Sequence, residues 1–177
     1  MLAGRGATYG ARVSLDPVTP QPSVHLREAT AHDVGFLTDV VLVATVAQGR
    51  VPEDFDEHEF RSGFSAWTAE QVGAVRPDDL EHSTTYVIEI EGERAGRLRV
   101  VRAPDHRELA GIQLLPAHQQ HGIGTHLVEQ FLVEARAAGL PARISVEKDN
   151  PRARALYERL GFAKVGETEA EVQLEAR

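Results

Sequence analysis

The chain has 177 residues, of which 42% are hydrophobic, so it is long enough to bury the core of one domain. Its formal net charge of −8 argues against nucleic acid or an anionic membrane as its main partner, and no apolar run approaches the roughly 18 residues of a membrane span. The absence of cysteine excludes disulfides, thiolate metal sites and a cysteine nucleophile, and it fits a cytoplasmic protein.

The first 21 residues differ in character from the rest of the chain. Glycines and prolines interrupt any periodicity in residues 1–21 and large apolar side chains are sparse, so a flexible extension is expected. Residues 22–177 contain no internal repeat and no linker, and they are expected to form a single domain. Alternation over 23–28 predicts its first strand, and helical spacing predicts a helix from an N-cap at Thr30 to about Ala47.

An acidic stretch and an aromatic stripe follow the first helix. Residues 52–59 hold five acids, which favour the first turn of a helix and then face water; alternatively, they attract a cationic substrate. Phe60, Phe64 and Trp67 share one face of the predicted second helix. We expect these rings to pack in the core, and the alternative is an aromatic wall beside a substrate.

The second half of the chain alternates strands and helices. Period-two alternation predicts three consecutive antiparallel strands, over residues 84–90, 95–101 and 108–115. A helix ending at Gly139 then leads to a strand over 142–146, and this unit predicts a parallel strand pair with a right-handed crossover. A last helix, over 150–161, begins with asparagine as N-cap and proline at its first position, and two closing strands follow.

A polar loop with two glycines joins the third strand to its helix. Gly122 and Gly124 lie where that helix begins. Glycine lets the backbone turn with its N–H groups pointing one way, and a helix start adds unpaired donors. This order is typical of a phosphate-binding loop, and a simple tight turn before a helix is the alternative.

Two separated motifs resemble the GCN5-related N-acetyltransferase (GNAT) superfamily. The first is Gln119-Gln120-His121-Gly122-Ile123-Gly124, which matches the family's Gln/Arg-x-x-Gly-x-Gly/Ala. The second covers residues 150–162 and matches Asn-x-x-Ala-x-x-Leu-Tyr followed by Gly-Phe. The resemblance implies the GNAT fold, a single α/β domain with a mixed, roughly seven-stranded sheet that is flanked by helices and contains a splayed parallel strand pair.

The resemblance also implies an acetyl-CoA-dependent N-acetyltransferase that transfers an acetyl group directly to a primary amine, without a metal. Coenzyme A would enter the gap between the splayed strands. Its pantetheine arm would bond to the strand edge formed by Ile112, Gln113, Leu114 and Leu115. Its pyrophosphate would bind the backbone of Gln119, Gln120, His121, Gly122, Ile123, Gly124 and Thr125. Asn150 would contact the pantetheine arm, and Ala153 completes the expected cofactor-binding set.

Two residues are candidates for the chemistry, because direct transfer needs a base and a proton donor but no protein nucleophile. Tyr157 would lie near the thioester sulfur and protonate the leaving thiolate; a core tyrosine is the alternative. Glu108 lies fourteen residues before the first loop glycine, as the catalytic glutamate does in histone-acetylating members. In a strand without a bulge, Glu108 would share a face with Ile112. One alternative is that Glu108 is an ordinary residue at the start of the strand. The base would then be Glu28, Glu89, a residue of the acidic stretch or ordered water.

The loop departs from common family patterns, since it has no arginine or lysine. Backbone donors must then do most of the phosphate binding, and protonation of His121 is expected to strengthen coenzyme A binding as the pH falls. A metal site at His118, His121 and His126 is disfavoured because their spacing suits no common site. A Rossmann-like dinucleotide site is excluded, since the third glycine is absent at Leu127.

The competing function is a non-catalytic acyl-CoA-binding or sensor domain of the same fold, and Tyr157 favours catalysis over it. The acceptor, a small molecule or a protein amine, is expected to contact residues 30–79 and the loops near Asp105 and Gly166. Acids in these regions favour a cationic acceptor. A homodimer is the default expectation for the oligomeric state.

Overall fold

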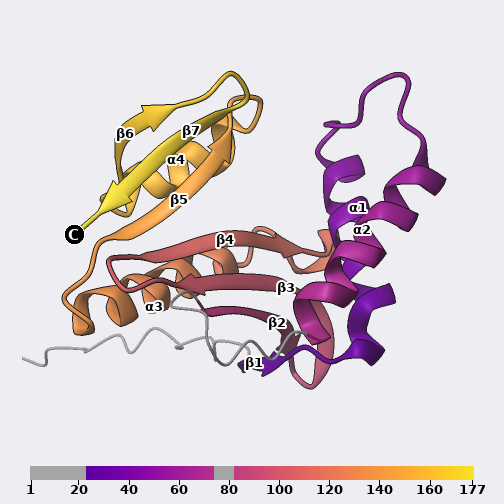
Figure 1. The fold of residues 1–177 in the computed structure, drawn as a ribbon, viewed down its shortest axis with the longest axis horizontal. Helices are drawn as coiled ribbons and strands as arrows, with labels where there is room; N and C mark the ends of the chain where they lie inside the picture. Colours follow the sequence, from indigo (N-terminus) through magenta and orange to yellow (C-terminus); the bar gives the residue numbers. More distant parts are fainter. Residues whose placement is uncertain (1–22, 74–81) are drawn as a thin grey trace, which may run out of the picture.

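The computed structural model describes residues 23–73 and 82–177 (Figure 1). These residues form a seven-stranded sheet in the order β1-β2-β3-β4-β5-β7-β6, in which only β4 and β5 are parallel. The strands are β1 (Val24–Glu28), β2 (His82–Ile90), β3 (Glu93–Arg102), β4 (Arg107–Leu114), β5 (Ala142–Glu147), β6 (Ala163–Glu167) and β7 (Glu171–Ala176). The helices are η1 (Ala31–Asp33), α1 (Val34–Ala47), α2 (Glu57–Gly73), η2 (Pro116–His118), α3 (Ile123–Ala137) and α4 (Pro151–Arg159).

The predicted fold class and element order are confirmed, including the antiparallel strands and the parallel pair. The turn and helix ends fall at glycines with positive φ, namely Gly92 at 85°, Gly139 at 68° and Gly161 at 94°. These angles strain any residue with a Cβ, so the glycines fix where the chain reverses. The predicted extension over residues 1–21 lies outside the described residues. None of the described helices is long and apolar enough to cross a membrane.

The sheet divides into two parts between β4 and β5. These strands pair only at residues 107–109, against Ala142, Arg143 and Ile144. Beyond that point β4 continues to Leu114 beside β3, while β5 continues to Glu147 beside β7. In Figure 1 the β5–β7–β6 part tilts away from β1–β4. The splayed parallel pair expected from the sequence is therefore confirmed, and it leaves one edge of β4 open.

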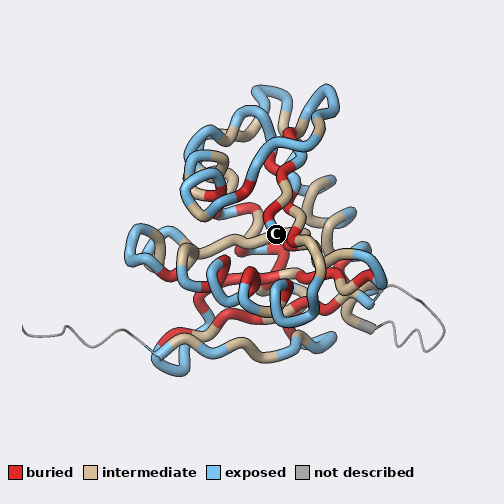
Figure 2. Tube along the Cα trace, turned by 90° about the vertical axis from the view of Figure 1, so that its left-hand side faces the viewer, coloured by how far each residue is buried: buried red, intermediate tan, exposed pale blue. Residues whose placement is uncertain are grey.

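The two faces of the sheet differ in chemistry. On one face, Leu98, Val100 and Leu109 pack with α3 residues such as Leu127 and Phe131 in a continuous buried cluster that extends to α4. Figure 2 shows this buried layer running through the centre of the molecule. The opposite face is covered by α1 and α2. Alternation along β3 turns Arg97 and Arg99 toward that second face, so this face is polar beneath α2, whereas Arg102 bonds to Glu134 of α3 on the first face.

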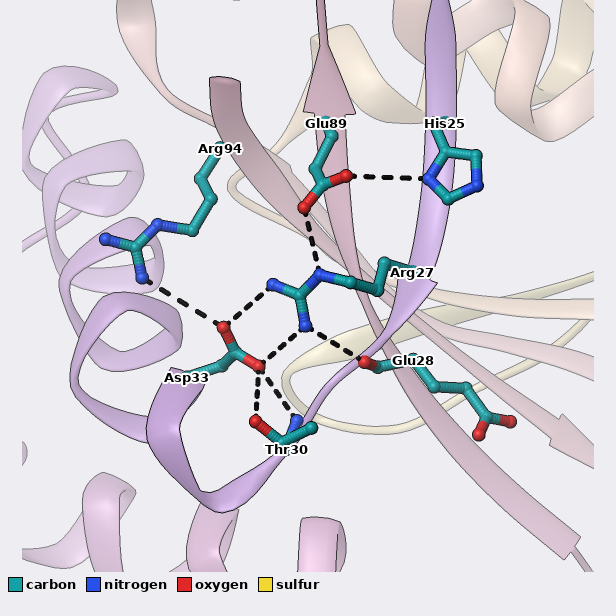
Figure 3. A network of polar contacts seen from close by, with 7 residues as sticks. All are labelled: His25, Arg27, Glu28, Thr30, Asp33, Glu89 and Arg94. Atoms are coloured by element: carbon teal, nitrogen blue, oxygen red, sulfur yellow. Dashed lines mark hydrogen bonds and ion pairs between the residues drawn. The ribbon is translucent and has the colours of Figure 1, made fainter. Parts of the chain in front are cut away.

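A network of polar contacts fixes the start of α1 against the first two strands (Figure 3). Arg27 of β1 makes a bidentate pair with Asp33, at 2.9 Å for both N–O distances, and its Nε donates to Glu89 of β2 at 2.9 Å. The backbone N–H of Thr30 donates to the same Asp33 carboxylate at 2.8 Å. Chiefly because of Arg27, the pKa of Asp33 lies well below its usual range. The helix start predicted at Thr30 is thus confirmed and anchored to the sheet.

Candidate active site

The open edge of β4 offers backbone hydrogen-bonding groups to the gap. Leu115 N–H donates to the Ala95 carbonyl at 2.9 Å, and Gln113 lies opposite Arg97. Residues that bond to the partner strand alternate with residues that do not in an antiparallel pair. Ile112 and Leu114 therefore turn their backbone groups toward the gap, whereas Gln113 and Leu115 turn theirs toward β3. The Leu114 carbonyl accepts a bond from Gln119 Nε2 at 2.8 Å. The Leu114 N–H and both backbone groups of Ile112 have no partner among residues 23–73 and 82–177.

A β-bulge interrupts β4 at Ala110, two residues before Ile112. The register of β3 and β4 shifts so that Val100 opposes Leu109 and Arg99 opposes Gly111, which leaves Ala110 as the extra residue. A bulge reverses the in-and-out alternation beyond it. Glu108 consequently shares a face with Gly111 and Gln113, toward α1 and α2, and the expectation that it shares a face with Ile112 is wrong.

The glycine loop ends in a row of free backbone donors. Gln120 and Gly122 have positive φ, at 67° and 78°, and Gly122 is the N-cap of the 15-residue helix α3. Among the described residues, no backbone N–H from Gln120 to Thr125 donates a hydrogen bond within the protein. Six consecutive donors at a helix N-terminus form a site for an anion such as a pyrophosphate. The Gln119 side chain donates to the Leu114 carbonyl at the end of β4.

The second motif forms the start of α4 beyond the gap. Asn150 is the N-cap, and its Oδ1 accepts a bond from Ala153 N–H at 3.2 Å. Its side-chain amide donates no hydrogen bond to the described residues. Tyr157 is buried, with its ring 6.0 Å from that of Phe162. Burial, and secondly the nearby charge of Glu147, raise the pKa of Tyr157 to about 12, so its hydroxyl keeps its proton at physiological pH.

The remaining candidate, Glu108, lies where β4 and β5 are still paired, opposite Arg143. Its Oε2 is 3.9 Å from His106 Nε2, and about a third of its side chain is exposed. The bulge residue Ala110 is two positions away, which is roughly 7 Å along a strand. Glu108 therefore lies beside the bulge, on the face of the sheet that α1 and α2 cover.

The aromatic stripe of α2 lies over charged residues rather than in the core. Phe60, Phe64 and Trp67 are only partly buried, and their rings follow one another at 5.4 and 5.5 Å. Trp67 is 37% exposed, and the guanidinium of Arg99 lies 5.0 Å from its ring centre. The expectation of core packing is wrong, because the sheet face beneath α2 carries arginines that stack on these rings.

Arg97 is the residue of this face that pattern reasoning missed. It is 4% exposed, and its guanidinium lies 5.6 Å from the Phe64 ring and 5.8 Å from the Trp67 ring. The available signal was the alternation of arginines with Leu98 and Val100, which marks a strand with one polar face. A polar face covered by an aromatic helix is a candidate binding surface.

Comparisons with known proteins agree with this architecture. The model of the "Acetyltransferase (GNAT) family" matches residues 51–162, which is most of the chain. The chain therefore belongs to the acetyltransferase (GNAT) family. Mycothiol acetyltransferase from Nocardia farcinica (strain IFM 10152) is 40% identical over 75 residues, 42% of this chain and 24% of that protein. The chain thus aligns with about a quarter of the length of this relative.

Solved structures show the same fold at low sequence identity. PaiA N-acetyltransferase from Thermoplasma acidophilum, in complex with coenzyme A, is 16% identical and has a TM-score of 0.73, with 88% of this chain and 99% of that chain covered. An acetyltransferase from Thermus thermophilus is 17% identical with a TM-score of 0.66, over 87% and 96% of the two chains. The described residues contain no group of three or more potential metal ligands.

Proposed function

We propose that the chain is an acetyl-CoA-dependent N-acetyltransferase that acts on a primary amine. The observation that supports this most is the open β4 edge beside a row of free N–H donors. Ile112 and Leu114 would bond to the amides of the pantetheine arm as a neighbouring strand would. The donors from Gln120 to Thr125 would hold the pyrophosphate without a lysine or arginine. The free amide of Asn150 would contact the arm from the other side of the gap.

The proposed reaction is direct transfer from the thioester to the amine. The amine nitrogen forms a bond to the acetyl carbonyl carbon, the carbon–sulfur bond breaks, and one proton passes from nitrogen to a base. A backbone N–H of the bulge at Ala110 would stabilise the charge that develops on the carbonyl oxygen. Glu108, directly or through a water molecule, would accept the proton, because it faces the acceptor side of the sheet.

Tyr157 would act as a hydrogen-bond donor to the leaving thiolate of coenzyme A. Its hydroxyl remains protonated because burial raises its pKa to about 12, so a donor is present whenever the thiolate forms. Because a phenol with this pKa holds its proton more firmly than a thiol does, Tyr157 would stabilise the departing thiolate through a hydrogen bond to its sulfur. Tyr157→Phe should therefore lower kcat by about 100-fold and leave coenzyme A affinity within about 2-fold.

The experiment that tests the function measures thiol release from acetyl-CoA with a panel of primary amines, together with calorimetric binding of coenzyme A. Turnover on at least one amine, lost in Tyr157→Phe with binding retained, supports the enzyme. The non-catalytic sensor keeps the same binding surface, and it would bind tightly and release no thiol with any amine. Equal kcat for the wild type and Tyr157→Phe would remove the tyrosine from the mechanism while leaving the activity in place.

A further inference from the structure

Arg97 is a buried cation with almost none of its hydrogen-bonding capacity used. A guanidinium has five N–H donors. The single hydrogen bond that Arg97 makes with the described residues runs from Nη1 to Gln113 Oε1 at 3.0 Å. Its Nε is fully buried and has no partner among the described residues. Buried polar groups are otherwise paired in folded proteins, so this guanidinium has capacity for a ligand.

The charge of Arg97 is also unbalanced. No carboxylate in the described part of the chain forms an ion pair with Arg97, and the charged group that lowers its pKa is a second cation, Arg99. Burial and then Arg99 lower the pKa of Arg97 to about 10, which still leaves it charged at neutral pH. Buried arginines are normally matched by an anion, because isolated charges are costly to remove from water. An anionic ligand would compensate the buried positive charge of Arg97.

The position of the guanidinium relates it to the proposed chemistry. A Cβ added to Gly111 would lie 2.9 Å from Arg97 Nη1, so the guanidinium rests directly against β4 at this glycine. Gly111 follows the bulge residue Ala110, beside which the acetyl group is proposed to lie. The rings of Phe64 and Trp67 cover the guanidinium from α2, with centroids 5.6 and 5.8 Å away. An anion held here would lie close to the reacting carbonyl.

We propose that Arg97 binds a carboxylate of the acetyl acceptor, so that the acceptors are primary amines that carry a carboxylate, with α-amino acids as the simplest class. The proposal rests on the proposed acetyltransferase function and specifies its substrate. The planar guanidinium matches a carboxylate with two parallel N–H donors, which a point cation does not. The α-amine is separated from the carboxylate carbon by only one carbon, which suits the short distance from Gly111 to the bulge. The cationic acceptor expected from the acidic stretch is not the class that this face favours.

The test compares matched acceptors with the full-length protein and saturating acetyl-CoA. Each pair consists of an α-amino acid and its carboxamide, which share the amine and the side chain. The wild type should show about 100-fold higher kcat/KM for the acid, since a charge-assisted bond to a desolvated guanidinium is lost in the amide. In Arg97→Met the ratio should fall to within about 3-fold, and Arg97→Lys should lie between, because it keeps the charge without the planar pair of donors.

Arg94→Met is the matched control, because it removes one positive charge from the same strand at a half-exposed position whose Nη1 is 4.0 Å from Asp33. Its acid-to-amide ratio should equal that of the wild type, and coenzyme A affinity should be the same in all four proteins. Equal rates on acid and amide, or an Arg97→Met variant that keeps the preference, would overturn the carboxylate site. A preference for phosphate-bearing amines over carboxylate-bearing ones would overturn the choice of anion.

Failure of the acetyltransferase function itself has a different signature, namely no thiol release from the wild type with any amine. The carboxylate site is then tested by fluorescence, since Trp67 is the only tryptophan in the chain and its ring lies beside Arg97. Titration of the coenzyme A complex with an α-amino acid should give a saturable change in emission that the carboxamide and inorganic phosphate do not give. No change with the amino acid, or the same change in Arg97→Met, contradicts the proposal.

Discussion

Replacement of Arg97 by methionine should make the fold more stable, although it removes a side chain from the interior. Methionine is similar in length and can fill the space beneath the aromatic rings. Burial and Arg99 lower the pKa of Arg97 from its ordinary value to about 10. At about 1.36 kcal/mol for each pKa unit, the folded state disfavours the charged form by roughly 3 kcal/mol.

Two favourable contacts are lost with the charge and offset part of this gain. The stacking on Phe64 and Trp67 is worth about 1 kcal/mol, and the hydrogen bond to Gln113 contributes about as much. The expected net increase in the free energy of unfolding is about 1–2 kcal/mol, or roughly 2–8 °C in Tm for a domain of this size. The lowered pKa means that the unfolded state binds more protons above about pH 10. The advantage of Arg97→Met should thus be constant at neutral pH and shrink as the pH rises past 10.

Urea unfolding followed by far-ultraviolet circular dichroism measures this difference without relying on Trp67, which lies beside the substituted residue. Arg94→Met is the control, and its free energy of unfolding should stay within about 0.5 kcal/mol of the wild type, as is usual for a surface position. Destabilisation of Arg97→Met by more than about 1 kcal/mol would mean that the guanidinium is a structural element whose interactions are already satisfied. The buried charge of Arg97 would then not indicate a ligand site.

Two further predictions concern other parts of the molecule. Arg27→Met should lower the free energy of unfolding by about 2–3 kcal/mol in urea titrations, because it leaves the buried Asp33 carboxylate without its main partner. The depressed pKa of Asp33 stabilises the fold above about pH 4 and this contribution is lost as the pH falls further, so the variant should show a shallower acid limb. Because the pKa of Tyr157 is raised to about 12, the wild type should lose stability between pH 10 and 12, whereas Tyr157→Phe should lack that loss, as measured by thermal unfolding across this range.

Local signals in the sequence are sufficient for most of the fold. Alternation and helical spacing predict the strands and helices to within a few residues, and glycines such as Gly139 and Gly161 mark the helix ends because their φ values are positive. The strand–helix–strand unit around α3 predicts the parallel pair. The sites at the glycine loop and at Asn150 follow from two short motifs whose geometry is mainly local.

The remaining features depend on contacts between distant segments. The bulge at Ala110 is a property of the pairing between β3 and β4, and it reverses the face on which Glu108 lies. The environment of Phe64 and Trp67 depends on which side chains β3 places beneath α2, and helical spacing alone cannot distinguish an apolar floor from a charged one. Arg97 has no motif, because its significance comes from burial without an anionic partner among the described residues.

Amide hydrogen exchange measured by nuclear magnetic resonance, with and without coenzyme A, tests the account most directly. The Gln113 amide already bonds to β3 and should exchange slowly in both states. The amides of Ile112 and Leu114 face the gap between β4 and β5, and coenzyme A should slow their exchange by at least about tenfold by bonding to them. Protection that appears at Ile112 and Leu114 but leaves Gln113 unchanged is the predicted result. Unchanged exchange at Ile112 and Leu114 at saturating coenzyme A would contradict the proposed binding site.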